Sequence, residues 1–402
     1  MGQMLMAIAL AVLSTVAAAR EPYKTAAEFH PSDETEVVGW KMSEIVYSDN
    51  VRRRALSADY APLEAYLQSV LDKVYPEFPG KFRVRVFPDI GANAMAMPNG
   101  DIYVGGGILA RMTSEAQLAA LLAHEAAHVT HRHGAEGVET HLAIHGAIGV
   151  INAAISSIPI PMANLTVAAV SPLVRLVSQY GVSFTAISSI YGFSRARERE
   201  ADEVGFNRMV AAGYDPREAS KLFEALALEA AVSLESHPFF FASHPELESR
   251  IASFKELTRQ LPSSGTFIGE AEFEAQVRPY RVKLMEREMK WLQHRNLVGY
   301  FQRPEVARLY GPGEASFYLA EALRRQGLPE DALKAPAAYR KALAEGYPVN
   351  LVMEPLILTH LRLKQGLEAQ SAINEWVALG KARDGLDIKE YEAQALKLIT
   401  EK

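Results

Sequence analysis

The stretch Leu121–Gly134 reads LLAHEAAHVTHRHG and contains the pattern His-Glu-x-x-His at His124, Glu125 and His128. Helical residues four positions apart project about 40° apart and lie about one turn apart, so His124 and His128 can bind the same metal ion. Glu125 is rotated by about 100° from His124, where its carboxylate can reach a water molecule on that ion. Zinc lowers the pKa of such a water to about 7, and a glutamate can then take the proton. The pattern therefore predicts a zinc site, with one ion in the chain, and makes Glu125 the general base.

The residues around this motif predict a long helix. Ser114 followed by Gln117 is typical of a capping box at a helix start. Gly134 stands where a C-terminal cap is expected. The helix is expected to bury one apolar stripe, which consists of Leu118, Leu121, Leu122, Ala126 and Val129.

A third ligand is expected from a second helix. Metzincins require Gly at position 131 and His at position 134, whereas this chain has His131 and Gly134. Gluzincins use a Glu, often in the pattern E-x-x-x-D, which fits Glu198 to Asp202. Glu198 would then bind the metal, and Asp202 would hydrogen-bond a ligand His and fix its tautomer.

Two alternatives to this assignment stay open. Glu200 lies in the same run and is a rival ligand. The run is also rich in charge, as expected for a solvated helix without a metal.

The composition limits the kind of protein. A chain of 402 residues suggests two or three domains. The net charge of −6 argues against nucleic acid as a partner, because phosphate binding requires a basic surface. The chain has no cysteine, so disulfides and thiol catalysis are excluded and metal ligands must come from His, Asp, Glu or water.

The N-terminus predicts export. Met4–Leu13 is an apolar run that is too short to cross a bilayer comfortably, and Ala17–Ala19 gives a cleavage pattern. We therefore expect a signal peptide over residues 1–19 and a periplasmic protein. No Lys or Arg precedes the apolar run, so an uncleaved anchor or a mis-assigned start is the alternative.

Residues 146–174 and 176–194 carry no charge and are long enough to span a membrane. Several Pro, Asn and Ser residues interrupt them. We favour buried or surface-amphipathic helices with a mobile loop over two spans, which leaves room for peripheral membrane contact through residues 146–194.

The remaining pattern predicts an α+β fold that is mostly α. Short strands are expected near residues 82–86, 93–97 and 102–104. Pro262–Gly265 is the best boundary, which gives a gluzincin-like peptidase domain over residues 20–264 and a helical domain over residues 265–402. The helical part shows two loose helix–Gly–helix segments, which suit tetratricopeptide-like repeats or a plain bundle equally well.

Four segments together resemble the HtpX-related zinc metallopeptidases. SRAREREAD and LLAHEAAHVTHRHG look like the paired signature blocks of that family, and NAMAMPNGDIYVGGGIL and SHPELESRI resemble two further blocks. With the predicted export and the helical C-terminal part, the chain is most similar to the BepA-like periplasmic proteases. The resemblance covers residues 60–255 with specific motifs and 266–402 only loosely.

The resemblance implies zinc, endopeptidase activity, the ligands His124, His128 and Glu198, and the base Glu125. By the same resemblance, the substrates are misfolded or stalled cell-envelope proteins. The helical repeats would contact the outer-membrane assembly machinery, because BepA-like proteins act in outer-membrane protein quality control and carry tetratricopeptide repeats.

The family comparison also raises His244 as a gate, because the His of this His-Pro block can approach the zinc and close the site. A loop His that packs on the domain is the alternative, and His237 is a weaker duplicate. Arg250 either steadies an oxyanion or pairs with an acidic residue, and we favour the pairing. His133 matches a His common in the family, without an implied catalytic role.

Ala94, Met95, Ala96 and Met97 are expected to offer a strand edge to an extended peptide substrate. Two other functions compete with the peptidase. One is a chaperone or adaptor that works through its helical repeats with a largely shut zinc domain. The other is a membrane-embedded peptidase.

Overall fold

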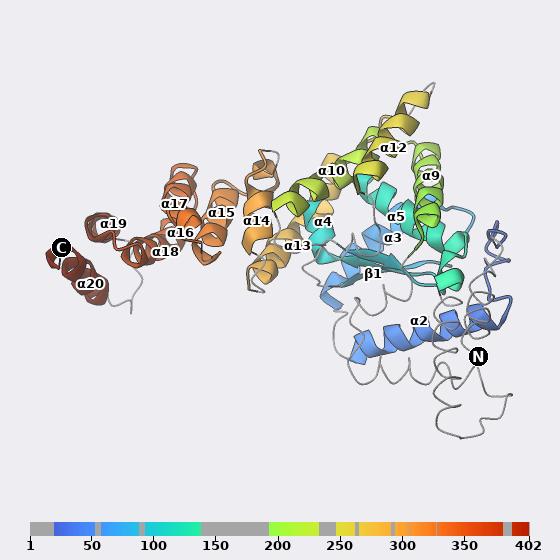
Figure 1. Ribbon diagram of the computed structural model, residues 1–402, viewed down its shortest axis with the longest axis horizontal. Coiled ribbons are helices and arrows are strands. Elements are labelled where there is room, and N and C mark those ends of the chain that lie inside the picture. The colour runs from blue at the N-terminus through green and yellow to red at the C-terminus, as the bar shows by residue number, and fades with distance from the viewer. Residues whose placement is uncertain are drawn as a thin grey trace, which may run out of the picture. The chain divides into compact units, whose positions relative to one another are not determined.

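The structure is a computed structural model, shown in Figure 1. It describes residues 20–52, 58–87, 93–137, 193–232, 247–261, 265–290, 294–304, 306–326, 328–380 and 388–401. Tertiary contacts divide the chain into a first unit, Met1–Ala225 with His237–Gln276, and a second unit, Leu226–Ser236 with Val277–Lys402. The domain boundaries that the sequence suggests after residues 19 and 264 stay predictions.

The first unit contains a three-stranded sheet formed by β1 (Arg83–Phe87), β2 (Ala94–Ala96) and β3 (Asp101–Gly105). Its order is β1-β3-β2, with β1 parallel and β2 antiparallel to β3. The turn before β3 contains Gly100 at φ 87°, a conformation that favours glycine. The three short strands lie close to the residues at which the sequence predicts strands, and β2 lies at an edge of the sheet.

Helices α3 (Ala61–Val74), α4 (Gly106–Arg111) and α5 (Glu115–Thr130) contact the strands of this sheet (Figure 1). The other helices of the first unit are α2 (Glu34–Arg52), a 3₁₀ turn (Ala58–Tyr60), α9 (Arg195–Ala211), α10 (Arg217–Val232, whose last turns belong to the second unit) and α12 (Leu247–Gln260). Every residue of α5 is buried. This makes α5, which carries the His-Glu-x-x-His pattern, the central helix of the unit.

The start of α5 is held by hydrogen bonds from several elements. Ser114 Oγ accepts from the Gln117 N–H at 3.2 Å, as expected of an N-cap. The buried Glu115 carboxylate accepts from Tyr66 Oη at 2.8 Å, Lys73 Nζ at 2.8 Å and Tyr214 Oη at 2.7 Å. A buried carboxylate with three donors is well satisfied, so these bonds fix the first turn of α5.

The end of α5 differs from the sequence prediction. The helix ends at Thr130, the residue in the left-handed conformation is Arg132 with φ 62°, and Gly134 lies in a following helical turn. The prediction of Gly134 as the cap was therefore wrong. The physical reason is that the Arg132 guanidinium is bound by Glu36 and lies 4.8 Å from the centre of the Tyr23 ring, which offsets the cost of a positive φ.

The contact between α9 and α5 is more extensive than that between any other two described elements. At the contact is Gly205, where an added Cβ would lie 2.8 Å from the backbone N of His124 and 3.0 Å from its Cα. The buried face of α9 consists of Glu198, Ala201, Asp202, Gly205, Phe206 and Met209, at the spacing of one helical stripe. Glu198 and Asp202 are therefore on the same face as the glycine that lets the two helices approach.

The second unit is built from helices. They are α13 (Glu270–Lys290, whose first turns belong to the first unit), α14 (His294–Phe301), a 3₁₀ turn (Ala307–Leu309), α15 (Glu314–Arg325), α16 (Pro329–Ala332), α17 (Ala335–Ala344), α18 (Val349–Arg362), α19 (Gly366–Ala378) and α20 (Ile388–Thr400). Helices next to one another in the chain pack together from α14 to α20, and Trp376 and Tyr339 are fully buried.

The expected fold class, mostly helical with a small sheet, is confirmed. Leu333 and Lys334 separate α16 from α17. The more specific prediction of tetratricopeptide-like repeats stays a prediction.

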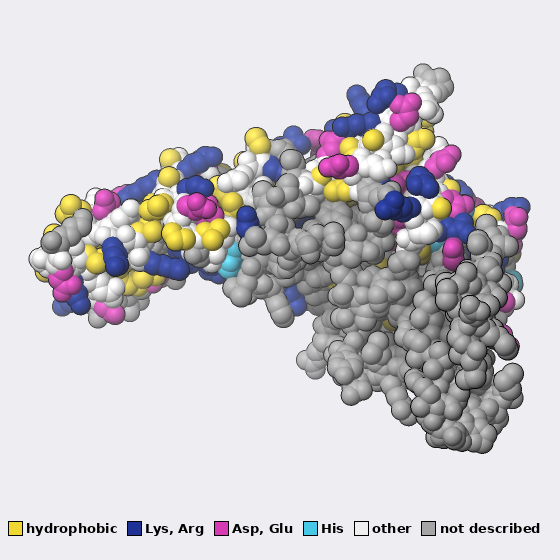
Figure 2. Space-filling view, in the orientation of Figure 1, with side chains coloured by type: hydrophobic (Ala, Val, Ile, Leu, Met, Phe, Trp, Pro, Cys, Tyr) yellow, Lys and Arg dark blue, Asp and Glu magenta, His cyan; other side chains and the backbone are white. Residues whose placement is uncertain are grey.

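The surface of the second unit mixes apolar and charged side chains (Figure 2). Its more exposed large apolar residues include Leu333 at 58%, Leu367 at 67% and Leu396 at 58%. Such residues, interspersed with Lys, Arg, Asp and Glu, give the helices a mixed surface without one dominant sign of charge on the visible face.

Within the described ranges, no helix combines the length and the apolar character needed to cross a bilayer. The uncharged segments 146–174 and 176–194 lie outside the described residues, apart from Phe193 and Ser194. The predicted signal peptide, residues 1–19, also lies outside them.

We predict that Gly205→Ala destabilises the first unit. Its Cβ would meet the α5 backbone, so the helices must separate at a cost of about 1–3 kcal/mol, the usual range for overpacking. Chemical unfolding of the purified protein measures this. Gly311→Ala is the control, because its Cβ would be 3.5 Å from the nearest atom, an ordinary contact. Equal stability of Gly205→Ala and the wild type would show that the helix contact tolerates a methyl group.

Candidate metal centre

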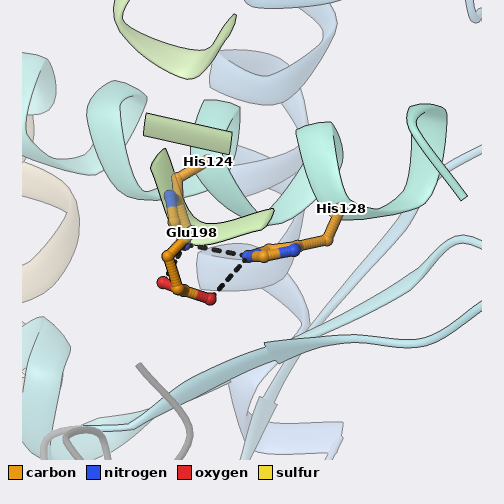
Figure 3. A group of neighbouring side chains, drawn as sticks. All are labelled: His124, His128 and Glu198. Atoms are coloured by element: carbon orange, nitrogen blue, oxygen red, sulfur yellow. Dashed lines mark hydrogen bonds and ion pairs between the residues drawn. The ribbon is translucent and has the colours of Figure 1, made fainter. Parts of the chain in front are cut away.

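Three predicted ligands from two helices meet at one buried point (Figure 3). His124 and His128 come from α5 and Glu198 from α9, and one ligand atom of each lies within 4.8 Å of the others. The two Nε2 atoms are 3.1 Å apart, and the Glu198 carboxylate lies 3.4 Å from His128 Nε2 and 3.6 Å from His124 Nε2. All three side chains are at most 3% exposed.

These separations fit a zinc ion. Ligands placed 2.0–2.1 Å from a tetrahedral ion lie about 3.3 Å from one another, close to the three distances above. Two imidazoles and one carboxylate are also a ligand set that catalytic zinc uses. The donor geometry of these residues therefore suits the metal that the sequence predicts.

The far side of each imidazole is held by a partner. His124 Nδ1 lies 2.9 Å from the Asp202 carboxylate, and His128 Nδ1 lies 2.9 Å from His133 Nδ1. When Nδ1–H donates to such a partner, the Nε2 lone pair is free to point at a metal. The Phe193 ring also stacks on His128, with centroids 3.7 Å apart and planes at 12°.

Arg250 of α12 neutralises the acidic side of the site. Its Nε and Nη2 donate to Asp202 at 2.9 and 2.6 Å, and its Nη1 lies 3.3 Å from the Glu198 carboxylate. The structure thus places Arg250 in an ion pair with acidic residues, the role that we favour from the sequence. The guanidinium lies 4.5 Å from the centre of the Phe223 ring, in the range of a cation–π contact.

This pairing sets the charge on Asp202. Burial alone would raise its pKa, but the charge of Arg250 and the hydrogen bond from His124 outweigh burial and lower the pKa to about 2. Burial likewise disfavours the charge on Arg250, yet Asp202, Glu198 and Glu125 raise its pKa in sum. The site therefore holds one buried cation among three acidic residues.

Glu125 is fully buried on α5, beside the ligand His124. Its effect on the pKa of Arg250 places its carboxylate within electrostatic range of the cluster. The residue that the motif predicts as general base therefore lies close to the three candidate ligands.

Glu200, the rival ligand, does not join the three. It lies 3.1 Å from His133 Nε2 and 2.8 Å from Arg197, and its side chain is 39% exposed. His133 itself is buried, and burial lowers its pKa to about 4, so it is neutral and able to accept a hydrogen bond. The sequence did not predict that His133 and Phe193 contact a ligand, because neither lies on the helical stripe of His124 and His128.

Two of the four residues that the sequence predicts to bind substrate, Ala96 and Met97, border a cavity beside His128. Ala96, Met97 and His128 line it, together with Trp40 and Phe193. Ala94, Met95, Ala96 and Met97 are each at most 6% exposed. His244 and His237, the predicted gate and its duplicate, lie outside the described residues.

A helix with His-Glu-x-x-His and a Glu from a second helix define a site of the metallopeptidase type. The sequence profile of Peptidase family M48 matches residues 58–258, which is half of the chain and includes His124, Glu125, His128, Glu198 and Asp202. The chain belongs to peptidase family M48, a family of metal-dependent enzymes.

Two kinds of named relatives match part of the chain. The beta-barrel assembly-enhancing protease of Escherichia coli is 29% identical over 174 residues, which are 42% of this chain and 33% of that protein. The mitochondrial metalloendopeptidase OMA1 of Schizosaccharomyces pombe is 30% identical over 201 residues, 49% of this chain and 53% of that protein. The match thus spans about a third to a half of these relatives. The predicted family and the predicted class of protein, a metalloprotease, are confirmed.

The buried ion pair predicts a pH dependence of stability. The pKa of Asp202 is about 2 in the folded protein, against an ordinary value of 3.8, so its stabilising effect is present above pH 4 and is lost as the pH falls towards 2. We expect metal-free Asp202→Asn to be less stable than the wild type by about 2 kcal/mol at pH 6, with a smaller difference at pH 3. Urea unfolding at both pH values measures this, with the exposed Asp72→Asn as control. A difference that does not change with pH would contradict the assignment.

Proposed function

We propose that the chain is a zinc-dependent endopeptidase that uses His124, His128 and Glu198 as metal ligands and Glu125 as general base. The observation that carries the proposal is the convergence of two Nε2 atoms and one carboxylate, 3.1–3.6 Å apart, beside the buried Glu125. Three protein ligands leave a fourth position of a tetrahedral ion open, as catalytic sites require. Membership of peptidase family M48 supports the same reading.

A bound zinc supplies Lewis acidity, which polarises a peptide carbonyl and makes a water molecule acidic at neutral pH. Glu125 accepts the proton of the attacking water and then delivers it to the leaving amine. Asp202 holds His124 in the tautomer that directs Nε2 to the metal, and Arg250 forms ion pairs with Asp202 and Glu198.

The edge strand β2 is the proposed binding place for an extended peptide. Met97 N–H donates to Asp101 O at 2.8 Å and Gly105 N–H donates to Asn93 O at 2.8 Å. Hydrogen bonds alternate along antiparallel strands, so the N–H and C=O groups of Ala94 and Ala96 point away from β3. A peptide that pairs with these groups would run beside the cavity lined by Ala96 and His128.

We propose misfolded or stalled envelope proteins as substrates and the periplasm as the compartment. The support is the apolar run Met4–Leu13 with Ala17–Ala19, together with the name of the Escherichia coli relative, which refers to β-barrel assembly. The OMA1 relatives are named as mitochondrial, so the compartment must be tested by fractionating cells that express the full chain. Exposed apolar residues of the second unit, such as Leu367 and Leu396, are the proposed contacts to an assembly partner.

The first test is Glu125→Gln in the purified full chain. Because the amide cannot accept the proton, we expect casein cleavage to fall by about 10²–10⁴-fold with zinc content unchanged. Glu203→Gln, an exposed position on α9, should cleave like the wild type. Zinc-free wild type, or equal cleavage by Glu125→Gln, would overturn the proposal. Full biological function of Glu125→Gln would favour the adaptor alternative.

The second test is Ala96→Pro. Proline is accepted on edge strands but removes the N–H group that points away from β3. We expect about a tenfold loss of casein cleavage, equivalent to about one hydrogen bond, with zinc content and unfolding midpoint unchanged. Ala96→Ser keeps the N–H and is the matched control. If the proline variant cleaves as fast as the serine variant, peptides do not pair with this part of β2.

A further inference from the structure

A line of three side chains leads from the metal centre to the surface. His128 Nδ1 lies 2.9 Å from His133 Nδ1, and His133 Nε2 lies 3.1 Å from the Glu200 carboxylate. Glu200 in turn accepts from Arg197 at 2.8 Å, and Arg197 also donates to Glu136 at 2.7 Å. The line connects α5, the turn that follows it, and α9.

The direction of each hydrogen bond follows from the chemistry. When Nε2 of His128 binds the proposed metal ion, its lone pair is used there, so the proton of His128 is on Nδ1 and is donated to His133 Nδ1. His133 Nδ1 then acts as acceptor, and the His133 proton is on Nε2, where the Glu200 carboxylate accepts it. Each of the two imidazoles thus uses one nitrogen as donor and one as acceptor, and the carboxylate fixes both tautomers.

The position of His133 depends on the turn after α5. In an uninterrupted helix, the residue five positions after His128 would be rotated from it by about 500°, which is one full turn plus about 140°. Its side chain would therefore point away from the face that carries the ligands. The turn at Arg132, held by Glu36, instead returns His133 to His128. The His133 side chain is completely buried, so no solvent can replace it as acceptor.

We propose that His133 and Glu200 are positioning residues that hold His128 in its metal-binding tautomer and orientation. His124 has the equivalent support directly from Asp202, whereas His128 obtains it through an imidazole that ends on a carboxylate. The proposal rests on the metal site of the proposed function and adds two residues to it. Neither residue is one of the three proposed ligands, His124, His128 and Glu198.

The test measures zinc affinity of the purified full chain by competition with a chelating dye. Partners of ligand histidines contribute about 10–100-fold in metal affinity, so His133→Ala should lose that amount. His133→Asn places an acceptor where Nδ1 was and should recover most of the affinity. His133→Gln keeps only the contact to Glu200 and should be as weak as His133→Ala. The Co²⁺ absorption spectrum of each variant reports the ligand geometry independently of activity.

The controls separate positioning from folding. His131→Ala removes a neighbouring half-buried histidine that bonds Thr130 and should leave affinity unchanged. Unfolding midpoints of the metal-free proteins show whether a variant is folded. If His133→Ala does not fold, Glu200→Gln tests the same line of side chains, with Glu203→Gln as its control. We expect Glu200→Gln to lose about 3–10-fold in zinc affinity. This loss is below the full 10–100-fold because the amide oxygen can still accept a hydrogen bond.

Each outcome decides between the two proposals. Wild type that binds no zinc would overturn the proposed function itself. Wild type that binds zinc while His133→Ala binds equally well would overturn only the positioning role. Equal weakness of His133→Asn and His133→Ala would assign the loss to packing and would also overturn it.

Discussion

The close contact between α5 and α9 is the constraint on which the metal centre depends. Gly205 has no side chain, and any Cβ there would overlap the backbone at His124. Glu198, Asp202 and Gly205 share one face of α9, so the approach at Gly205 also brings both carboxylates to the histidines of α5. One face of α9 thus provides both the glycine that allows the close helix contact and the two carboxylates that face the histidines.

This approach has an electrostatic consequence that the fold must resolve. Glu125, Glu198 and Asp202 are buried close together, and carboxylates removed from water are costly unless they are paired. Arg250 supplies a bidentate pair to Asp202 and reaches Glu198, so helix α12 is part of the site although it provides no predicted ligand. A divalent cation, as the proposed function requires, would supply further positive charge to this cluster.

The ends of α5 are fixed by residues distant in the sequence. Glu115 accepts three hydrogen bonds at the first turn, and Arg132 is tied to Glu36 just after the last turn. A helix held at both ends cannot rotate freely, so its two ligands keep their direction. The turn at Arg132 also allows His133 to contact His128. The contact of Arg132 with Glu36 therefore both fixes the end of α5 and allows His133 to reach His128.

The sequence by itself determined the elements and the chemistry of the first contact shell. Helical spacing pairs His124 with His128 and Glu198 with Asp202, and alternation predicts the first strand, because these patterns depend only on local backbone geometry. Only the tertiary structure decided the strand order β1-β3-β2, the exclusion of Glu200 from the ligands, and the contacts of His133 and Phe193 with His128. Gly134 failed as the expected cap for the same reason: an ion pair with Glu36, nearly 100 residues earlier, moved the left-handed residue to Arg132. Long-range partners of this kind leave no periodic signal in the chain, so they become visible only when the folded elements are placed side by side.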